Sequence, residues 1–461
     1  MNINQDIQPA LCLSLDNLNW IYRGEGNANL VISLPQEKII LRMQKCEYDI
    51  IVNKRVIQQM ELKIITDLKF YKFVMLPLLG KAFVQPPFLA RISDKEIAEL
   101  DAKLYNFRPS FRLNKGVRFS LLTGHPDYTH LPPSLTYEYF QSGLQCSNLL
   151  ALHNECFTYC IEIKPKQGWI PLCDRNHPKC AFCCNQYLKY MKKRVRKISQ
   201  YCPLDLFSGN ISRMKKALKN LLKTPQNNLK IFENGNLIYS EDSLRDYVEI
   251  LRAILEPGSE EVNSERLIEK WSALLQEALT KRLSDAPSYT FVQDGKENDT
   301  KDNSVGIPMS SPLEGMIPAC DWNSEPLPEN CVLQRILSIQ KLQNTSFNSI
   351  YKSYCDKKDF EEDYAYVDNL LCVKKCWDPI QRYLLATTAK DCSIFITLQR
   401  CSNKNIDNNL HYVTDFDGIS YRINIGISDL DSKPLSCIEK HYRRDSEILS
   451  AILFYANSKV M

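Results

Sequence analysis

A short basic motif, Glu162-Ile-Lys164-Pro-Lys166, follows an apolar run, Phe157 to Ile163, that predicts a buried strand. Proline restricts its own backbone and favours an extended conformation at Lys164. Since the two lysines are two positions apart, an extended chain would send both ammonium groups out on one face, and Gly168 would let the backbone turn away. Two adjacent cations suit a ligand with several phosphate groups, although a solvated surface loop is an equal alternative.

Carboxylates stand at the ends of two further segments. Asp391 directly precedes a β-rich run, where it can accept a hydroxyl proton or hold Mg²⁺. Asp429 and Asp431 end an alternating segment, Tyr421 to Leu430, and on a regular strand they would share one face. Hard carboxylate oxygens there suit Mg²⁺ that bridges nucleotide phosphates; a polar strand end is the alternative.

A glycine-containing turn near the N-terminus, Gly24-Glu25-Gly26-Asn27, lies between two predicted strands. Glycines allow backbone N–H groups to approach phosphate oxygens closely. Arg42 lies on the next alternating strand, where a cation can pair with the α- and β-phosphates of a nucleotide, as the strand lysine of protein kinases does. A simple hairpin is the alternative interpretation of the turn.

Cysteine and histidine cluster after the basic motif. Cys173, His177, Cys180 and Cys183 offer four zinc-type ligands within 11 residues, which predicts a structural rather than a catalytic zinc site. Because the spacing is cramped, the fourth ligand could instead be one of three neighbours: His153, Cys156 or Cys184. Unpaired buried thiols are the alternative.

Further polar residues could contact anions. They are Arg112, Lys189 at the start of the basic run that ends at Lys197, Asn227 with Asn228, and Lys433 before Pro434. Such a run is usually a solvated face, and capping of a turn is the alternative for the asparagines.

Composition limits the classes of protein. The chain has 461 residues, 44% hydrophobic residues, 18 cysteines and a net charge of +4. That length predicts about three domain-sized units or two lobes with insertions. We expect no membrane span, since no apolar run approaches about 18 residues, and no secretory signal, so the thiols should be reduced. With so small a net charge, an anionic partner must be bound by local clusters of cations.

Periodicity predicts where the helices and strands lie. Helices are expected over 50–72, 93–105, 211–222, 243–284 (two) and 329–355, strands within 73–92, and a hairpin at Asn234-Gly235. The polar stretch 285–327 predicts a mobile insertion.

Seven motifs in the same order resemble the inositol-pentakisphosphate 2-kinase family. They are Tyr22 to Val31, Glu162 to Lys166, Gln186 to Lys189, Pro203 to Gly209, Pro225 to Asn228, Thr388 to Ile394 and Asp429 to Pro434. The resemblance implies an α+β fold with two lobes, distantly related to protein kinases. The N-lobe would span 1–150, and the C-lobe would span 151–461 with an inositide-binding insertion. It also implies transfer of the ATP γ-phosphate to the 2-hydroxyl of inositol pentakisphosphate, giving inositol hexakisphosphate.

The resemblance also implies roles for individual residues. Asp391 would be the catalytic base and a Mg²⁺ ligand, and Asp429 a second Mg²⁺ ligand. The nucleotide contacts would be Gly24, Glu25, Gly26, Asn27, Arg42 and Glu162. The inositide contacts would be Arg112, Lys164, Lys166, Lys189, Asn227, Lys433 and Tyr442.

The chain departs from the family pattern near its C-terminus. Cys437 stands where some members have arginine, and the tyrosine equivalent is His441 or Tyr442. The resemblance further implies a monomer in the cytoplasm and nucleus with ATP, Mg²⁺ and structural Zn²⁺.

Three rival functions are weighed against the kinase. The first is a different inositol phosphate kinase activity, and the second is a non-catalytic binder of inositol polyphosphate or nucleic acid. RNA-binding motifs with interleaved aromatic residues are absent from the sequence. A protein kinase is disfavoured because the sequence has neither a His-Arg-Asp nor an Asp-Phe-Gly string.

Overall fold

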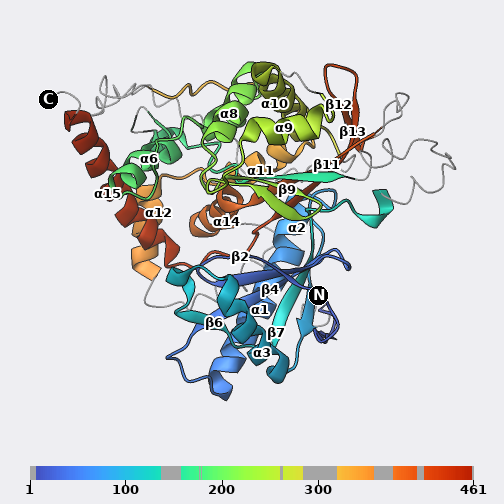
Figure 1. The fold of residues 1–461 in the computed structure, drawn as a ribbon. Helices are drawn as coiled ribbons and strands as arrows, with labels where there is room; N and C mark the ends of the chain where they lie inside the picture. The colour runs from blue at the N-terminus through green and yellow to red at the C-terminus, as the bar shows by residue number, and fades with distance from the viewer. Residues whose placement is uncertain are drawn as a thin grey trace, which may run out of the picture.

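The computed structural model describes residues 7–135, 157–175, 177, 179–259, 263–283, 319–357, 377–401 and 410–458. It contains two mixed α/β parts, each built on its own sheet, which confirms the predicted α+β class at that level. Figure 1 shows the first sheet, in blue, below the second sheet and its helices. The predicted lobe boundary near residue 150 lies outside the described residues.

The first sheet has the strand order β1-β5-β7-β4-β3-β2, with β6 paired to β4. Its strands are β1 (Leu11–Cys12), β2 (Ile21–Glu25), β3 (Asn29–Leu34), β4 (Ile39–Glu47), β5 (Phe88–Arg91), β6 (Lys115–Val117) and β7 (Leu121–Pro126). Alternating apolar residues of β3 and β4, such as Ile32 and Leu41, form its core together with helix α3 (Asp94–Leu104). A capping box between Ser93 and Glu96 fixes the start of α3 where the sequence predicted a helix.

The second sheet has the order β10-β9-β8-β11-β13-β12, and all its neighbouring strands are antiparallel. Its strands are β8 (Thr158–Ile163), β9 (Leu229–Glu233), β10 (Asn236–Tyr239), β11 (Ser393–Arg400), β12 (Tyr412–Thr414) and β13 (Ser420–Ser428). The predicted hairpin at Asn234-Gly235 joins β9 and β10, and both turn residues have positive φ. Helices α8 (Ile211–Lys223), α9 (Tyr247–Leu255) and α10 (Ser264–Thr280) lie above this sheet in Figure 1.

One long helical segment connects the two cores. Helix α1 (Lys54–Phe70) confirms the predicted helix, but the strands predicted over 73–92 are wrong except for β5. A π-helical turn (Tyr71–Met75) and α2 (Leu76–Leu79) continue the helix instead. Pro77 lies inside this continuous stretch, where its missing N–H interrupts the regular helical hydrogen bonds, and the π-helical turn comes just before it. Apolar residues of this extension, including Tyr71 and Met75, are buried in the core of the second sheet.

Several shorter elements surround the second sheet. They are η5 (Leu172–Asp174), α6 (Ala181–Met191), α7 (Pro203–Leu206), α11 (Val332–Gln340), α12 (Phe347–Lys357), α14 (Pro379–Asp391) and α15 (Cys437–Ser458), while η3 (Tyr105–Phe107) and η4 (Ser110–Arg112) belong to the first part. Helix α15 packs along α6, as the left side of Figure 1 shows. None of the helices in the described part of the chain is long and apolar enough to cross a membrane.

The predicted mobile insertion is only partly outside the described residues. Residues 319–327 are described, and they pack against the second core through Trp322 and Leu327. The backbone N–H of Glu325 donates to the carbonyl oxygen of Ser208 at 2.7 Å. The end of the predicted insertion is therefore part of the packed structure, because its apolar side chains find buried contacts.

One buried amide joins three segments beneath the strand ends. Gln340, the last residue of α11, is fully buried. Its Oε1 accepts from the N–H of Gly168 at 2.8 Å, and its Nε2 donates to the carbonyl oxygens of Lys166 at 3.0 Å and Ala389 at 3.3 Å. This side chain thus fixes the loop after β8 against the end of α14.

We expect Gln340→Ala to lower the free energy of unfolding by about 2–4 kcal/mol, because it leaves buried backbone groups without partners. Urea denaturation followed by circular dichroism measures the change. Gln276→Ala is the matched control, since this helical glutamine contacts Thr280 one turn along α10. Equal stability of the two variants would contradict the role given to Gln340.

Candidate active site and cysteine cluster

Asp391 ends helix α14 and lies between two of the predicted inositide-binding lysines. Its carboxylate oxygens are 3.2 Å from Lys166 Nζ and 3.0 Å from Lys433 Nζ. Burial raises the pKa of Asp391, but Lys433 and Lys166 outweigh that effect and lower the pKa to about 2. Asp391 is therefore ionised at neutral pH, with one lysine ammonium group at each of its two oxygens.

Asp429 forms a second ion pair, with Lys164. The Lys164 Nζ donates to its Oδ2 at 2.6 Å, and the Ser393 hydroxyl is 3.0 Å from the same oxygen. Burial raises the pKa of Asp429, but Lys164 and Arg42 hold it well below its usual range. An ionised carboxylate with open oxygen positions is chemically suited to a hard cation such as Mg²⁺.

The sequence predicted an extended basic motif, and this prediction is wrong at Lys166. Lys166 has φ of 64°, so the chain turns at this residue, and the two lysines meet different carboxylates. Gly168 does not supply the turn. A Cβ there would lie 2.1 Å from Phe207 Cδ2, so this glycine is required for close packing.

The prediction that Asp429 and Asp431 share a strand face is also wrong. Strand β13 ends at Ser428, and Asp429 has φ of 61°, which breaks the alternation. Asp429 consequently faces Lys164, whereas Asp431 contacts Arg42 of β4 at 2.5 and 2.7 Å. Arg42 thus comes close to the predicted Mg²⁺ ligands from the other sheet.

A serine that the sequence analysis did not single out, Ser393, bridges Glu162 and Asp429. The Ser393 hydroxyl is 3.0 Å from Glu162 Oε1 and 3.0 Å from Asp429 Oδ2. A hydroxyl has one proton, so it donates to one carboxylate at a time. Glu162 is largely buried, and Lys230 Nζ is 3.7 Å from its Oε2. The position of Ser393, two residues after Asp391, was the available signal.

The predicted nucleotide turn connects β2 and β3 and leaves its backbone accessible. Gly24 has φ of 143° at an irregularity in the β2–β3 pairing. A Cβ at Gly24 or Gly26 would meet nothing within 4 Å, and Asn27 is exposed. Open space over glycine backbone is the condition for close approach of a phosphate.

The Glu25 side chain cannot reach a nucleotide in this arrangement, contrary to what the sequence suggested. Its carboxylate is 1% exposed and accepts from Arg108 Nε at 2.8 Å and Arg108 Nη2 at 2.9 Å. Lys45 Nζ and the Tyr22 hydroxyl donate to the same carboxylate. Burial raises the pKa of Glu25, but the hydrogen bonds from Arg108 and Lys45 outweigh that effect and lower the pKa below its usual value. Glu25 anchors the turn from beneath, and Arg108 is the partner that sequence reasoning did not assign.

The remaining predicted contacts are distributed unevenly. Lys189 lies near enough to Lys166 for the two charges to interact. Burial lowers the pKa of Lys189 most, and the positive charge of Lys166 lowers it further. Arg112, in η4, lies beside the first sheet, where its charge acts on Tyr22. Asn227 is exposed before β9. The neighbouring Asn228 carbonyl accepts from the Lys164 N–H at 2.9 Å.

His441 and Tyr442, the two candidates for the family's tyrosine position, have different contacts on α15. The Tyr442 ring stacks on Tyr351 with centroids 3.8 Å apart. His441 Nδ1 instead lies 2.7 Å from the Tyr383 hydroxyl, and burial together with neighbouring cations, including Lys433, lowers its pKa to about 3. The geometry favours His441 over the predicted Tyr442 as the residue near the site.

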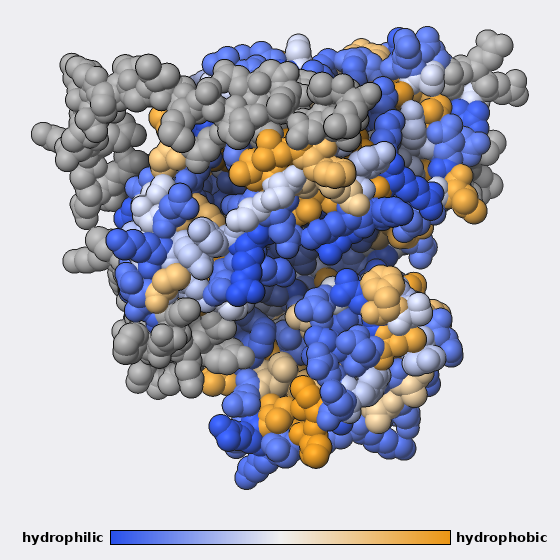
Figure 2. Space-filling model, turned by 90° about the vertical axis from the view of Figure 1, so that its left-hand side faces the viewer, coloured by the Kyte–Doolittle hydropathy of each residue, from blue (hydrophilic) through white to orange (hydrophobic). Residues whose placement is uncertain are grey.

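Together these residues lie where the two sheets meet. Arg42 comes from the first sheet, and the Asp391 and Asp429 groups come from the ends of α14 and β13. Figure 2 shows the surface hollowed between the smaller lower part and the larger upper part, with hydrophilic side chains around the hollow.

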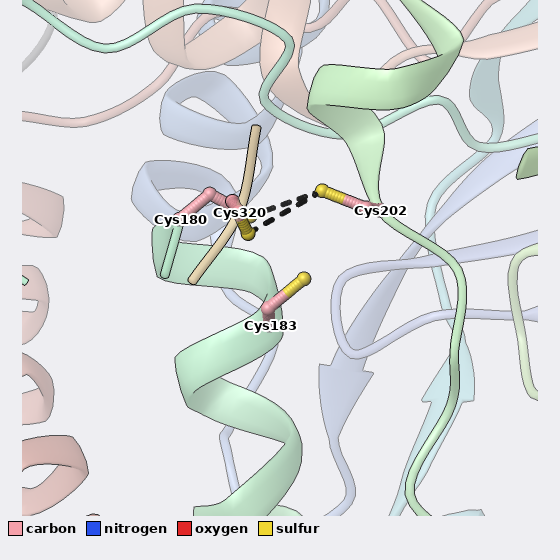
Figure 3. A group of neighbouring side chains, drawn as sticks. All are labelled: Cys180, Cys183, Cys202 and Cys320. Carbon is pink, nitrogen blue, oxygen red and sulfur yellow. Dashed lines mark hydrogen bonds between the residues drawn. The ribbon is translucent and has the colours of Figure 1, made fainter. Parts of the chain in front are cut away.

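Four cysteine sulfurs lie within 4.8 Å of one another: Cys180, Cys183, Cys202 and Cys320. Figure 3 shows them pointing toward one centre from α6, from the segment before α7 and from the segment 319–327. The Sγ separations are 4.0 Å for Cys180–Cys202 and 3.7 Å for Cys202–Cys320. Tetrahedral zinc with Zn–S bonds of about 2.3 Å would place the sulfurs about 3.8 Å apart, so the group fits such an ion.

The predicted zinc ligand set agrees with this cysteine group only in part. Cys180 and Cys183 belong to the group, but Cys173 and His177 do not. Cys173 is exposed in η5, and His177 is partly buried with its pKa lowered by that burial. The other two members of the group, Cys202 and Cys320, are distant in the sequence, and spacing alone could not indicate them.

Comparisons with known proteins show the family of the chain. A family profile described as inositol-pentakisphosphate 2-kinase matches residues 22–447. The chain is 28% identical to the inositol-pentakisphosphate 2-kinase of Danio rerio, with 95% of this chain and 94% of that protein covered. It is 26% identical to the enzyme of the same name from Arabidopsis thaliana, with 94% and 93% covered. Because the family profile matches most of its length, the chain belongs to the inositol-pentakisphosphate 2-kinase family.

Proposed function

We propose that this chain transfers the γ-phosphate of ATP to the 2-hydroxyl of inositol pentakisphosphate and releases ADP and inositol hexakisphosphate. Family membership supports the reaction. The observation that carries it is the Asp391 carboxylate, ionised and held between Lys166 and Lys433. A hydroxyl acceptor surrounded by phosphates needs such a base with cations on both sides.

In this proposal Asp391 receives the proton of the attacking hydroxyl. Phosphoryl transfer has a loose transition state, so the base needs to orient the hydroxyl and take its proton late. A pKa of about 2 suits orientation more than strong proton abstraction. When inositide phosphates attract Lys166 and Lys433, the stabilisation of the carboxylate weakens and its pKa rises toward a more effective value.

The ATP site would lie between the glycine-containing turn and Asp429. No side chain lies over Gly24 or Gly26, so a phosphate can come close to the turn, and Lys164 at Asp429 supplies positive charge. Asp429 and Asp391 would hold Mg²⁺, which neutralises charge on the β- and γ-phosphates when it is bound. Lys189 and His441 extend the cationic and polar surface on the inositide side.

We further propose that Cys180, Cys183, Cys202 and Cys320 hold a structural zinc ion. All four positions of a tetrahedral ion would be filled by protein, which is typical of structural sites. The ion would tie the start of α6 to residues 319–327. A monomeric state and cytoplasmic and nuclear localisation stay predictions that the family resemblance implies.

Asp391→Asn should lower kcat by about 10²–10⁴-fold, because the amide cannot accept the hydroxyl proton. The rate of hexakisphosphate formation from ATP and inositol pentakisphosphate, followed by anion-exchange chromatography, gives kcat for each variant. Asp378→Asn at the other end of α14 is the control, since asparagine also caps helices well. A wild-type protein that binds the inositide without turnover would contradict the proposed kinase activity. Equal rates for Asp391→Asn and wild type would show that another residue is the catalytic base.

Acid should destabilise the protein through Asp391 and Asp429, whose pKa values are both lowered in the folded state. Their stabilisation is complete above the ordinary aspartate pKa of about 3.9 and is lost as pH falls toward about 2. Lys166→Met raises the pKa of Asp391, so its melting temperature should fall less between pH 6 and pH 3 than that of wild type. Scanning fluorimetry at both pH values checks this. Lys81→Met, at an exposed site, should follow wild type.

Cys202→Ser should lose the bound zinc and lower the melting temperature. Purified protein analysed by inductively coupled plasma mass spectrometry gives the metal content per chain. The matched control is Cys173→Ser, which removes an exposed thiol outside the group and should retain the metal. Zinc retained in Cys202→Ser and lost in Cys173→Ser would reverse the ligand assignment.

A further inference from the structure

Arg42 and Asp431 join the first sheet to the segment that follows the second sheet. Arg42 is on β4, and its Nη1 and Nη2 donate to Asp431 Oδ1 and Oδ2 at 2.7 and 2.5 Å. The side chains are 16% and 28% exposed, so water screens this pair only partly. Two parallel charge-assisted hydrogen bonds fix the orientation of a guanidinium as well as its position.

The other edge of the same guanidinium faces the glycine-containing turn. With the Asn29 amide oriented by its hydrogen-bond partners, its oxygen accepts from Arg42 Nη2 at 2.8 Å and from Arg42 Nε at 3.2 Å. The backbone carbonyl of Asn29 accepts from the Gly26 N–H at 2.8 Å, which closes the turn. Arg42 has five N–H donors, and four of them are used by Asp431 and Asn29.

Asp431 is itself held in place by the site around it. Leu430 is fully buried, and the Thr388 hydroxyl on α14 lies 3.2 Å from the carbonyl oxygen of Asp431. The next residue, Ser432, donates to Asp67 Oδ1 of α1 at 2.7 Å. Asp431 therefore presents its carboxylate to Arg42 from a fixed position between Asp429 and Lys433.

We propose that Asp431 is a positioning residue that acts through Arg42 and Asn29 to hold the glycine-containing turn over the nucleotide. Asp431 is not a Mg²⁺ ligand in this proposal, because its bidentate pair with the Arg42 guanidinium keeps both of its oxygens occupied, whereas the lysines on Asp391 turn to the inositide phosphates. Its effect should concern ATP far more than the inositide, whose predicted lysines contact Asp391 and Asp429 instead. The inference rests on the proposed kinase function.

Asp431→Asn tests the proposal, since it preserves shape and removes the charge. We expect the KM for ATP to rise about 10-fold or more, as for loss of a bidentate ion pair, while the KM for inositol pentakisphosphate stays within about twofold. Asp431→Glu, which keeps the charge, should recover part of the loss. In Arg42→Gln, adding Asp431→Asn should raise the KM for ATP little further, because Asp431 acts through Arg42.

A second readout does not depend on catalysis. Amide hydrogen exchange over 24–29 and 42–44 should be faster in Asp431→Asn, with no change over 421–427 in β13. Glu61→Gln is the control, because it breaks another arginine–carboxylate contact of the first part, to Arg91 at 2.8 Å, and should leave both readouts unchanged.

An unchanged KM for ATP together with unchanged exchange would overturn the proposal. A lower KM would overturn it too, because it would mean that the ion pair competes with the nucleotide. If Asp431→Asn does not fold, Arg42→Lys, which keeps the charge but lacks the two-pronged geometry, replaces it in both measurements. A wild-type protein without kinase activity would contradict the proposed function, and the exchange experiment would still test the link.

Discussion

The site depends on balanced charge at the junction of the two sheets. Asp391, Asp429 and Asp431 are each paired with at least one cation that the sequence assigned to phosphate binding: Lys166 and Lys433, Lys164, and Arg42. Burial alone would raise the pKa values of Asp391 and Asp429, and the paired cations hold them below their usual range. The pairs keep both groups charged until phosphates arrive. They also connect strand ends that the backbone alone would leave independent.

This balance explains why the supporting polar contacts are buried. Gln340 holds the loop of Lys166 against the end of α14, and Glu25 holds the glycine-containing turn through Arg108. Neither side chain needs to contact a substrate to matter. Each fixes a backbone segment whose exposed side chains or amides would do so, because catalysis by positioning requires a rigid support.

Local signals in the sequence predicted much of this molecule. The amphipathic helix α1, the capped helix α3 and the Asn234-Gly235 hairpin follow from periodicity and turn chemistry. Ordered motifs identified the family and the residues around Asp391. Contacts between distant segments could not be predicted in this way. Cys202 and Cys320 are 118 positions apart, and Asp431 is far from Arg42, so only the folded chain brings them together. Residues 71–79 were misassigned because apolar residues with prolines fit broken strands as well as a buried helix.

The backbone at Lys166 and Asp429 has a consequence for how this protein can change. Both residues adopt positive φ, a conformation in which a side chain is strained and glycine is not. Glycine would relax the backbone at either position, but it would remove the ammonium or the carboxylate that the site uses. Local stability and chemistry therefore oppose each other just after the ends of two strands, β8 and β13, at one edge of the second sheet. A selection for heat resistance alone would favour substitutions at these positions, while a selection that includes turnover would keep the strained residues.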